Sequence, residues 1–391
     1  MTRAGSTRVL YVQYCNPAAY PPLEHSAQLL AEAGFDLTLL GTDVPSDALR
    51  FQPHPRIRVN VMSAHGTGVR QKLHYLVFAA WVLWWSLRWR PSWIYASDPL
   101  SCPVALAVGF LLPTRTIYHE HDVPAEADSQ MRVSIAMRIA LWARRKLARR
   151  ADLCVVPNRE RAEVFRRMTG REDLLSVWNC PTRAEATRPP REAEAGELRV
   201  VYHGSIVPDR LPLALVRALA SLPLGITLTV VGYETLGHFG YSKELEAEAA
   251  RLHVDERLRF VGAIPTRSAL IQHCGMFDVG LALFSQPHSD VNQRTMIGAS
   301  NKAFDFMACG LALLVTDLPE WREAFVEPGF GSSCQPDSVE SLAAALQWFW
   351  DHPAERQAMG LRGRQKILDD WNYERTFAPV LEQMVKEQTA A

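Results

Sequence analysis

The polar residues of the stretch 300–310 are of the types that bind a phosphorylated sugar. They are Ser300, Asn301, Lys302 and Asp305, and small residues and a glycine follow them. A helix start offers backbone N–H groups that suit a phosphate, and a carboxylate one turn later suits the hydroxyls of a sugar beside it. Residues 311–317 form an apolar run typical of a buried parallel strand, so we expect a helix that feeds a sheet. An ordinary capped amphipathic helix is the alternative, because such residues start most helices.

Glycine ends three strand-like stretches that precede this predicted helix. They are Gly204 after 199–203, Gly232 after 226–231 and Gly262 after 258–261. Glycine at a strand end lets the backbone come close to a ligand, and open α/β sheets bind ligands at the carboxyl ends of their strands. The three glycines together therefore indicate a binding site, with tight turns alone as the other reading.

A second polar cluster follows the strand-like stretch 116–118 in the N-terminal half. Its members are His119, Glu120, His121 and Asp122. A neutral imidazole can hydrogen-bond a hydroxyl, and histidine beside carboxylates can also hold a divalent metal ion, so the residues alone leave both uses open. The loop 15–22 contains Asn16 and two consecutive prolines, which make the loop stiff.

Strand-like and helix-like stretches alternate through both halves of the chain. This alternation predicts an α/β fold with parallel sheets covered by helices on both faces. The stretch 183–197 is rich in Ala, Glu, Arg and Pro and has little to bury, as is typical of a linker. We therefore predict two Rossmann-like doubly wound domains, 1–185 and 198–372, a linker over 186–197 and a C-terminal helix over 373–391.

Composition excludes several classes of function. The chain has 391 residues, enough for two domains, and 42 basic residues balance 42 acidic ones, which gives no global charge for nucleic acid. Seven scattered cysteines indicate a reducing compartment, and no apolar signal region precedes the first strand, so we expect a cytoplasmic protein. Dinucleotide-binding, Walker A and hydrolase-elbow motifs are missing, which disfavours redox, NTPase and serine-hydrolase chemistry.

Two further segments have the composition of a membrane contact. The Trp-rich stretch 73–89 is marginal in length for a span, and Arg90-Pro91 ends it, so a helix packed on a sheet is the simpler reading. The basic segment 144–150, with Arg132 and Arg138 upstream, is either a solvated face or a site for anionic lipid. Together the two segments suggest peripheral contact with an anionic membrane.

These features resemble the GT-B superfamily of glycosyltransferases, in particular the retaining enzymes of family four. The resemblance is strong over 200–375 and loose before that. Its motifs are 202–210 as the first strand and loop of the C-terminal domain, 230–232 and 260–262 as later strand ends, and 300–310 as the donor-site helix. The pair Asn301-Lys302 matches a subset of the family. The resemblance implies two domains that face a central cleft, with the last helix crossing back to the N-terminal domain.

The resemblance also implies roles on the donor side. Relatives have two cations in the first loop for the donor's diphosphate, where this chain has Ser205 and Arg210. They have two glutamates with seven residues between them, where this chain has Ile297 and Asp305, so Asp305 is expected to take the ribose hydroxyls. The implied donor-binding residues are Gly204, Ser205, Arg210, Gly232, Val261, Ser300, Asn301, Lys302 and Asp305.

On the acceptor side the resemblance implies that His121 contacts the donor sugar and that it is catalytic together with Arg210. The other acceptor-side residues are Asn16, His119, Glu120 and Asp122. No metal ion or cofactor is expected, because this fold neutralises the departing diphosphate with arginine and helix dipoles.

The expected function is retaining transfer of a sugar from a nucleoside-diphosphate sugar to a hydroxyl of a glycan or lipid-linked acceptor. Bacterial polysaccharide or glycolipid synthesis at the inner face of the plasma membrane is the expected setting. A sugar-nucleotide epimerase, an inverting transferase and a catalytically silent binding subunit are the alternatives.

Overall fold

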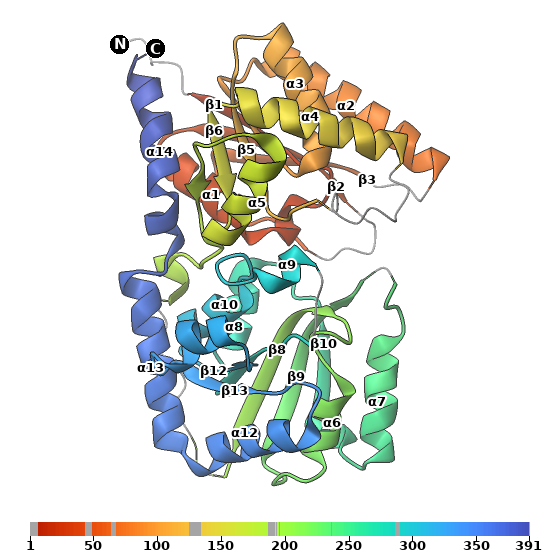
Figure 1. The fold of residues 1–391 in the computed structure, drawn as a ribbon, viewed down its shortest axis with the longest axis vertical. Helices are drawn as coiled ribbons and strands as arrows, with labels where there is room; N and C mark the ends of the chain where they lie inside the picture. The colour runs from red at the N-terminus through yellow and green to blue at the C-terminus, as the bar shows by residue number, and fades with distance from the viewer. Residues whose placement is uncertain are drawn as a thin grey trace. The chain divides into compact units, whose positions relative to one another are not determined.

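The computed structural model describes residues 7–43, 49–63, 68–124, 134–186, 192, 194, 196–235, 237–285 and 290–390. The chain divides into two compact units. Unit 1 contains Met1–Asn179 and Tyr373–Ala391, and unit 2 contains Cys180–Asn372. Figure 1 shows the fold of each unit.

Unit 1 is built on a seven-stranded parallel sheet with the order β3-β2-β1-β4-β5-β6-β7. Its strands are β1 (Arg8–Val12), β2 (Asp36–Asp43), β3 (Ile57–Ser63), β4 (Trp93–Ser97), β5 (Arg115–His119), β6 (Leu153–Val156) and β7 (Leu175–Ser176). Strands β4 and β6 are buried along their whole length, and β1 and β5 after their first residue, which explains their apolar sequences.

Helices cover both faces of this sheet. One face carries α2 (Val69–Trp89), α3 (Cys102–Leu111), α4 (Ile135–Arg150) and α5 (Arg159–Thr169), which share one apolar core. The other carries α1 (Pro21–Glu32) and the C-terminal α14 (Tyr373–Ala390). Short 3₁₀ turns η1 (Pro17–Ala19) and η2 (Pro99–Ser101) follow β1 and β4. The Tyr373 hydroxyl donates to the Pro22 carbonyl at 3.0 Å, so the last helix is part of unit 1.

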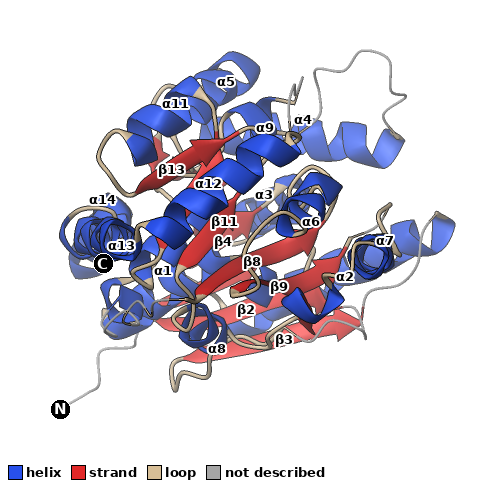
Figure 2. Ribbon diagram, turned by 90° about the horizontal axis from the view of Figure 1, so that it is seen from below, coloured by secondary structure: helices blue, strands red, loops and turns tan. Residues whose placement is uncertain are grey.

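Unit 2 is built on a six-stranded parallel sheet with the order β10-β9-β8-β11-β12-β13. Its strands are β8 (Leu198–Ile206), β9 (Ile226–Glu234), β10 (Leu258–Gly262), β11 (Val279–Ala282), β12 (Ala312–Thr316) and β13 (Gly331–Cys334). The predicted α/β class with two doubly wound parallel sheets is confirmed. Figure 2 shows helices flanking the strands.

The helices of unit 2 also form two layers. The first, α6 (Leu213–Leu219), α7 (Tyr241–Arg251) and α12 (Val339–Asp351), shares one core with the sheet. The others are α8 (Arg267–Cys274), α9 (Val291–Arg294), α10 (Lys302–Ala308), α11 (Pro319–Trp321), the π-helical turn η5 (Arg322–Val326) and α13 (Pro353–Asp369). Helix α10 packs between the sheet and α13, and all seven of its residues are buried.

The boundary between the units differs from the one that the sequence suggested. Residues 180–185, which the prediction placed in the N-terminal domain, belong to unit 2. The reason is the 3₁₀ turn η3 (Arg183–Ala186), where Glu185 forms an ion pair with Arg267 and Ala186 is fully buried. Of the predicted linker, residues 187–191, 193 and 195 lie outside the described residues.

Candidate active site

The three glycines that the sequence predicted at strand ends lie in the neighbouring strands β8, β9 and β10, although β8 and β9 continue past Gly204 and Gly232 to Ile206 and Glu234. Gly204 pairs with Gly232, and Gly262 pairs with Val231. A Cβ built on Gly232 would lie 1.8 Å from the Gly204 carbonyl oxygen, so the close approach of β8 and β9 requires glycine there. Val261 lies on the edge strand β10 and is 37% exposed. The structure therefore brings the predicted strand-end residues together.

Lys302 points toward Gly204 from the first turn of α10. Position 204 favours glycine for two reasons: a Cβ there would lie 3.0 Å from the Lys302 Nζ, and the backbone φ is +118°. Lys302 is only 8% exposed. Burial and the charge of Arg210, opposed by Asp305, together lower the pKa of Lys302 to about 7. The ammonium is thus held at the end of β8 in a poorly solvated place.

Arg210 lies in the turn after β8 and is half-buried. Its guanidinium lies 5.8 Å from the centre of the Phe284 ring, a cation–π distance. Ser205 contributes a carbonyl that accepts a hydrogen bond from the Tyr202 hydroxyl at 2.5 Å. Of the two loop positions that are cationic in relatives, Arg210 alone carries charge, and Lys302 supplies a second cation from a different element.

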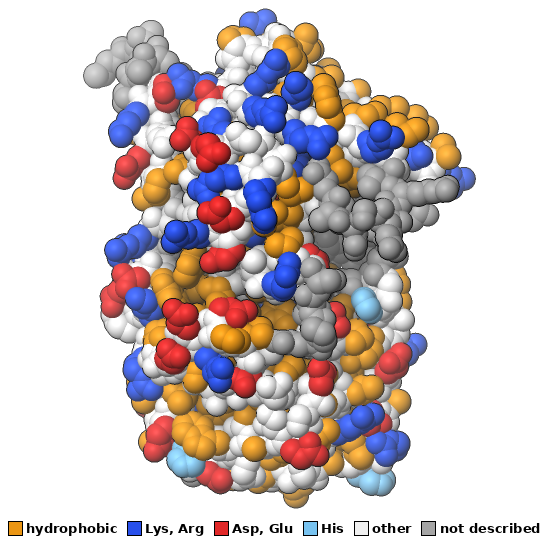
Figure 3. Space-filling view, viewed as in Figure 1, with side chains coloured by type: hydrophobic (Ala, Val, Ile, Leu, Met, Phe, Trp, Pro, Cys, Tyr) orange, Lys and Arg blue, Asp and Glu red, His pale blue; other side chains and the backbone are white. Residues whose placement is uncertain are grey.

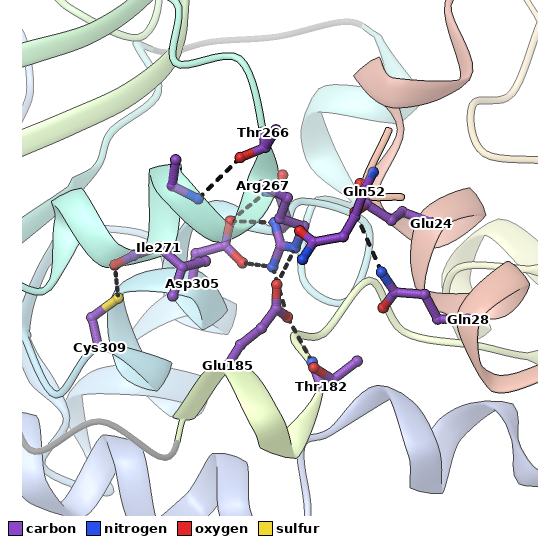
Figure 4. Close-up of polar contacts among 12 residues, drawn as sticks. Glu24, Gln28, Gln52, Thr182, Glu185, Thr266, Arg267, Ile271, Asp305 and Cys309 are labelled. Atoms are coloured by element: carbon purple, nitrogen blue, oxygen red, sulfur yellow. Dashed lines mark hydrogen bonds and ion pairs between the residues drawn. The ribbon is translucent and has the colours of Figure 1, made fainter. Parts of the chain in front are cut away.

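Asp305 does not occupy the place that the sequence predicted for it. Its side chain is fully buried, and both of its oxygens have protein partners. Arg267 donates to Asp305 Oδ1 at 2.6 Å and to Oδ2 at 3.2 Å, and Asn301 donates to Oδ2 at 2.5 Å. His203 Nε2 lies 3.3 Å from the same oxygen. Figure 4 shows Asp305 and Glu185 on Arg267. A ribose contact by Asp305 does not fit this arrangement.

The electrostatics of Asp305 agree with a structural role. Burial alone would raise the pKa of its carboxyl, but the charge of Arg267 and the neighbouring His203 outweigh burial and hold the pKa well below the usual range. Burial lowers the pKa of His203, although Asp305 opposes the shift. The carboxylate is therefore charged, and it fixes the start of α10 to α8 through Arg267.

The helix start offers less to a phosphate than the sequence suggested. The Ser300 N–H already donates to the Met296 carbonyl at 2.8 Å, which corrects its predicted role. The Asn301 side chain binds Asp305 and does not cap the helix. Ile297, at the position of the missing glutamate, is half-buried. Since α10 has only seven residues, the Lys302 side chain is the main positive feature that this element brings to the strand ends.

In unit 1, two histidines lie at the end of β5 and just after it. His121 Nε2 is 2.8 Å from Ser97 Oγ, and His119 Nδ1 is 2.7 Å from the Tyr95 hydroxyl. Their ring centres are 4.1 Å apart. Burial lowers the pKa of His121 to about 4, with Asp122 opposing and Arg161 adding to the shift. Burial and the neighbouring His121 also lower the pKa of His119. Both rings are neutral at pH 7.

The carboxylates of the same segment point elsewhere. Glu120 is buried and binds the Arg144 guanidinium, with a 2.7 Å bond to Arg144 Nη2, and accepts from the Tyr118 hydroxyl at 2.7 Å. Asp122 accepts from Arg161 Nη1 at 2.9 Å. Glu120 thus points into the core, which corrects its predicted place on the acceptor side. The carboxylates of Glu120 and Asp122 bind different arginines and do not converge on a metal site. Within the described ranges, no three His, Cys, Asp or Glu side chains are grouped to hold a metal ion.

Asn16 is also used locally. Its Oδ1 accepts from the Ala18 N–H at 3.0 Å, and its Nδ2 donates to Asp43 Oδ1 at 3.3 Å. The side chain caps η1 and ties the loop to the end of β2, and its acceptor contact stays a prediction.

Two features were missed by sequence reasoning. Arg267 and Glu185 complete the network around Asp305, and no local pattern marks either residue. Asp98, next to Ser97, has a φ of +80° and accepts from the backbone N–H groups of Tyr14 at 3.1 Å and Ser101 at 2.9 Å. Burial raises the pKa of Asp98 to about 7. The sequence Ser-Asp-Pro after a strand is the one signal that could have drawn attention to it.

Two parallel α/β units in one chain, with glycine strand ends and two cations in the second unit, have the architecture of a GT-B glycosyltransferase. Comparison with known families agrees. Residues 23–181 match the Glycosyl transferase 4-like domain, and residues 208–382 match a Glycosyl transferase-like domain. The chain belongs to the GT4-type glycosyltransferases of the GT-B fold.

Individual relatives are distant but cover nearly the whole chain. Glycogen synthase of Mycobacterium tuberculosis is 23% identical over 412 residues, which span 94% of this chain and 92% of the relative. Sucrose-phosphate synthase from Thermosynechococcus elongatus has a TM-score of 0.70 at 18% identity and covers 98% of this chain and 100% of its own. Anabaena HepE in complex with UDP-glucose has a TM-score of 0.68 at 17% identity, with coverage of 98% and 100%.

Proposed function

We propose that the protein is a retaining glycosyltransferase that moves a sugar from a nucleoside-diphosphate sugar to a hydroxyl of a glycan or lipid-linked acceptor. The observation that carries the donor class is the Lys302 ammonium at the end of β8, in the same electrostatic neighbourhood as Arg210. Two buried or half-buried cations beside glycine strand ends fit the two negative charges of a diphosphate. The neighbour HepE, solved with UDP-glucose, supports a nucleotide sugar as the ligand.

The proposed chemistry is mainly electrostatic. The bond between the anomeric carbon and the diphosphate oxygen breaks while Lys302 and Arg210 stabilise the charge that grows on the diphosphate. The acceptor oxygen bonds to the anomeric carbon on the same face, and its proton passes to the departing phosphate oxygen. This route needs no protein nucleophile, which agrees with Ile297 at the position of the missing carboxylate. We propose that these cations act without a metal ion or cofactor.

In unit 1 we assign His121 to a hydrogen bond with a substrate hydroxyl. Its ring is neutral, because burial lowers its pKa to about 4, and a neutral imidazole can donate or accept. Ser97 accepts from or donates to Nε2 at 2.8 Å and so fixes the ring's orientation. His121 is then a binding group and need not act as a base.

The setting that we propose is bacterial polysaccharide or glycolipid synthesis in the cytoplasm, at the inner face of the plasma membrane. The neighbour WaaG, a glycosyltransferase involved in lipopolysaccharide biosynthesis, has a TM-score of 0.63 at 14% identity and supports this choice by fold alone. No helix among the described residues has the length and apolar character needed to cross a membrane.

A thermal-shift panel of UDP-, GDP- and ADP-sugars tests the donor class. One nucleotide class should stabilise the wild type, and Lys302→Met and Arg210→Met should each weaken that ligand's affinity by about tenfold or more. Lys243→Met, an exposed lysine on α7, is the control and should bind normally. Unchanged affinity in both site variants would show that the diphosphate binds elsewhere.

Product analysis separates the alternatives. Retention of the donor's anomeric configuration, read by NMR, supports the proposed route, and inversion supports an inverting transferase. Release of a free epimer without any acceptor identifies an epimerase. Donor binding without turnover of any acceptor identifies a silent binding subunit.

A further inference from the structure

The outward face of α2 is apolar along most of its length. Its buried side is formed by His74, Phe78, Val82 and Ser86, which recur every four residues. The opposite side carries, all exposed, Leu73, Leu76, Val77, Ala80, Trp84 and Leu87. At 100° per residue these six positions lie within about 50° of one direction. The inner side of α2 packs on the sheet. An apolar outer side on the same helix indicates that a second apolar surface covers it.

The neighbouring helices continue this apolar face. Helix α3 contacts both α2 and α4 in the same layer on the sheet, and its end exposes Phe110 and Leu111. On α4, Ile135, Ile139 and Trp142 are exposed on one side, whereas the exposed Met137 lies on another side of the helix. Figure 3 shows hydrophobic side chains gathered at the upper right, where α2 lies in Figure 1, with Lys and Arg beside them. We call this set of exposed residues the α2–α4 face.

The charged residues of helices α2, α3 and α4 have one sign. Helices α2, α3 and α4 contain no Asp or Glu. Their exposed cations are Arg70, Lys72, Arg88, Arg138, Arg145, Lys146, Arg149 and Arg150. The Arg150 guanidinium lies 4.8 Å from the centre of the exposed Phe110 ring, so charge and apolar surface are interleaved. Arg144, in the same basic segment 144–150, is not exposed, because it forms a buried ion pair with Glu120. Arg132 lies outside the described residues.

We propose that the α2–α4 face binds the surface of an anionic phospholipid bilayer. Leucine, isoleucine and tryptophan side chains enter the boundary between headgroups and acyl chains, and the surrounding cations meet the lipid phosphates. The inference deepens the proposed function and rests on it only for the location of the acceptor. It names the surface and the chemical class of its partner.

The positive charge of the α2–α4 face favours an anionic bilayer over a second copy of the chain or another protein as the surface that covers it. Two copies of this chain related by a two-fold axis would bring cations against cations. A protein partner would need an apolar surface bordered by acidic residues over the outer faces of three helices. An anionic bilayer offers both properties over any area, and cations near its surface strengthen the attraction additively.

Vesicle co-sedimentation of the full chain tests the proposal. Wild-type protein should sediment with vesicles of phosphatidylcholine and phosphatidylglycerol, less so in high salt, and poorly with phosphatidylcholine alone. The apolar double variant Leu76→Gln/Trp84→Gln and the charge variant Arg138→Gln/Lys146→Gln should each reduce the partition coefficient by about tenfold. All four side chains are exposed, so the fold should be unaffected.

Matched controls come from exposed residues of unit 2. Leu224 and Phe239 are 84% and 72% exposed without a comparable apolar stripe, and Leu224→Gln/Phe239→Gln should sediment like the wild type. Lys243→Gln/Arg259→Gln is the control for charge. Every variant should keep the thermal shift with the nucleotide sugar that stabilises the wild type.

Three results would overturn the inference. They are a wild type that does not sediment, α2–α4 variants that sediment as well as the wild type, and controls that lose binding equally. Sedimentation-velocity analysis adds a fourth: a dimer that the α2–α4 variants abolish would assign the face to a second copy. If vesicles bind but no nucleotide sugar does, the proposed function fails while the membrane surface stands.

Discussion

The guanidinium of Arg267 holds both carboxylate oxygens of Asp305, at 2.6 and 3.2 Å, in the interior of unit 2. The same guanidinium binds Glu185, with its Nε 2.6 Å from Glu185 Oε1. One arginine at the first residue of α8 thus joins α10 to the turn η3 (Figure 4). The network explains how a short helix at the strand ends is held in one position.

Removal of Arg267 should strongly destabilise unit 2. Arg267→Met leaves the buried carboxylate of Asp305 and the half-buried one of Glu185 without their cation, and we expect a loss of about 3–5 kcal/mol in the free energy of unfolding by urea. The matched control is Arg217→Met, which removes an exposed arginine from its 2.6 Å pair with Glu248 and should cost less than about 1 kcal/mol. Similar losses in the two variants would mean that the buried network adds no more than a surface pair.

A 2′-deoxy nucleotide sugar can show whether Asp305 contacts the donor's ribose or only anchors Arg267. If Asp305 only anchors Arg267, Asp305→Asn weakens the natural and the 2′-deoxy nucleotide sugar by the same factor, because the effect comes from a shift of α10. Calorimetric titration of both ligands with both proteins gives the coupling directly. A 2′-deoxy penalty that is present in the wild type and absent in the variant would restore the ribose role.

The close approach of Lys302 to Gly204 predicts that adding one methyl group at residue 204 weakens donor binding. Gly204→Ala places its Cβ 2.8 Å from Lys302 Cε and strains a backbone φ of +118°, so donor affinity should fall by about tenfold or more. Gly240→Ala is the control, since Gly240 has a φ of +94° and open space around its Cβ. The Gly240→Ala variant has the backbone strain without the steric clash, so it should lose stability but keep its donor affinity. Normal affinity in Gly204→Ala would contradict the close contact.

The neutral histidines predict how stability depends on pH. Burial lowers the pKa of His121 to about 4, so between pH 6.5 and 4 the unfolded chain binds a proton at this residue and the folded chain does not. Stability should therefore fall as pH drops through this window, and less steeply in His121→Gln. Urea titrations at several pH values measure both slopes. Equal slopes would show that His121 titrates normally in the folded protein.

Much of the fold followed from sequence because its signals are local. Apolar stretches followed by glycine predicted β8, β9 and β10, although β8 and β9 continue past Gly204 and Gly232 to Ile206 and Glu234. The alternation of strands and helices predicted two parallel sheets. The boundary near residue 180 could not be found this way. It depends on the pairing of Glu185 with Arg267, which are 82 residues apart, and composition carries no trace of such a contact.

The candidate site was predicted in position but not in detail. The polar types at 300–305 indicated a ligand site, yet only the folded chain shows that Asp305 points inward and Lys302 points toward Gly204. Side-chain direction on a helix depends on what packs around it, here Arg267 and His203. In the same way Glu120, read as a site residue, turns into the core because Arg144 and Tyr118 bind it there.

The pH dependence of donor affinity directly tests the role of Lys302 as a diphosphate-binding cation. Burial lowers the pKa of Lys302 to about 7 without ligand, and a bound diphosphate favours the charged form, so binding above pH 7 must take up a proton. The diphosphate of a nucleotide sugar does not itself titrate near neutral pH. Calorimetry from pH 6 to 9 should show Kd rising by up to tenfold per pH unit above pH 7, and no such rise in Lys302→Met. A Kd that is independent of pH in the wild type, or equal in the two proteins, would contradict the assignment.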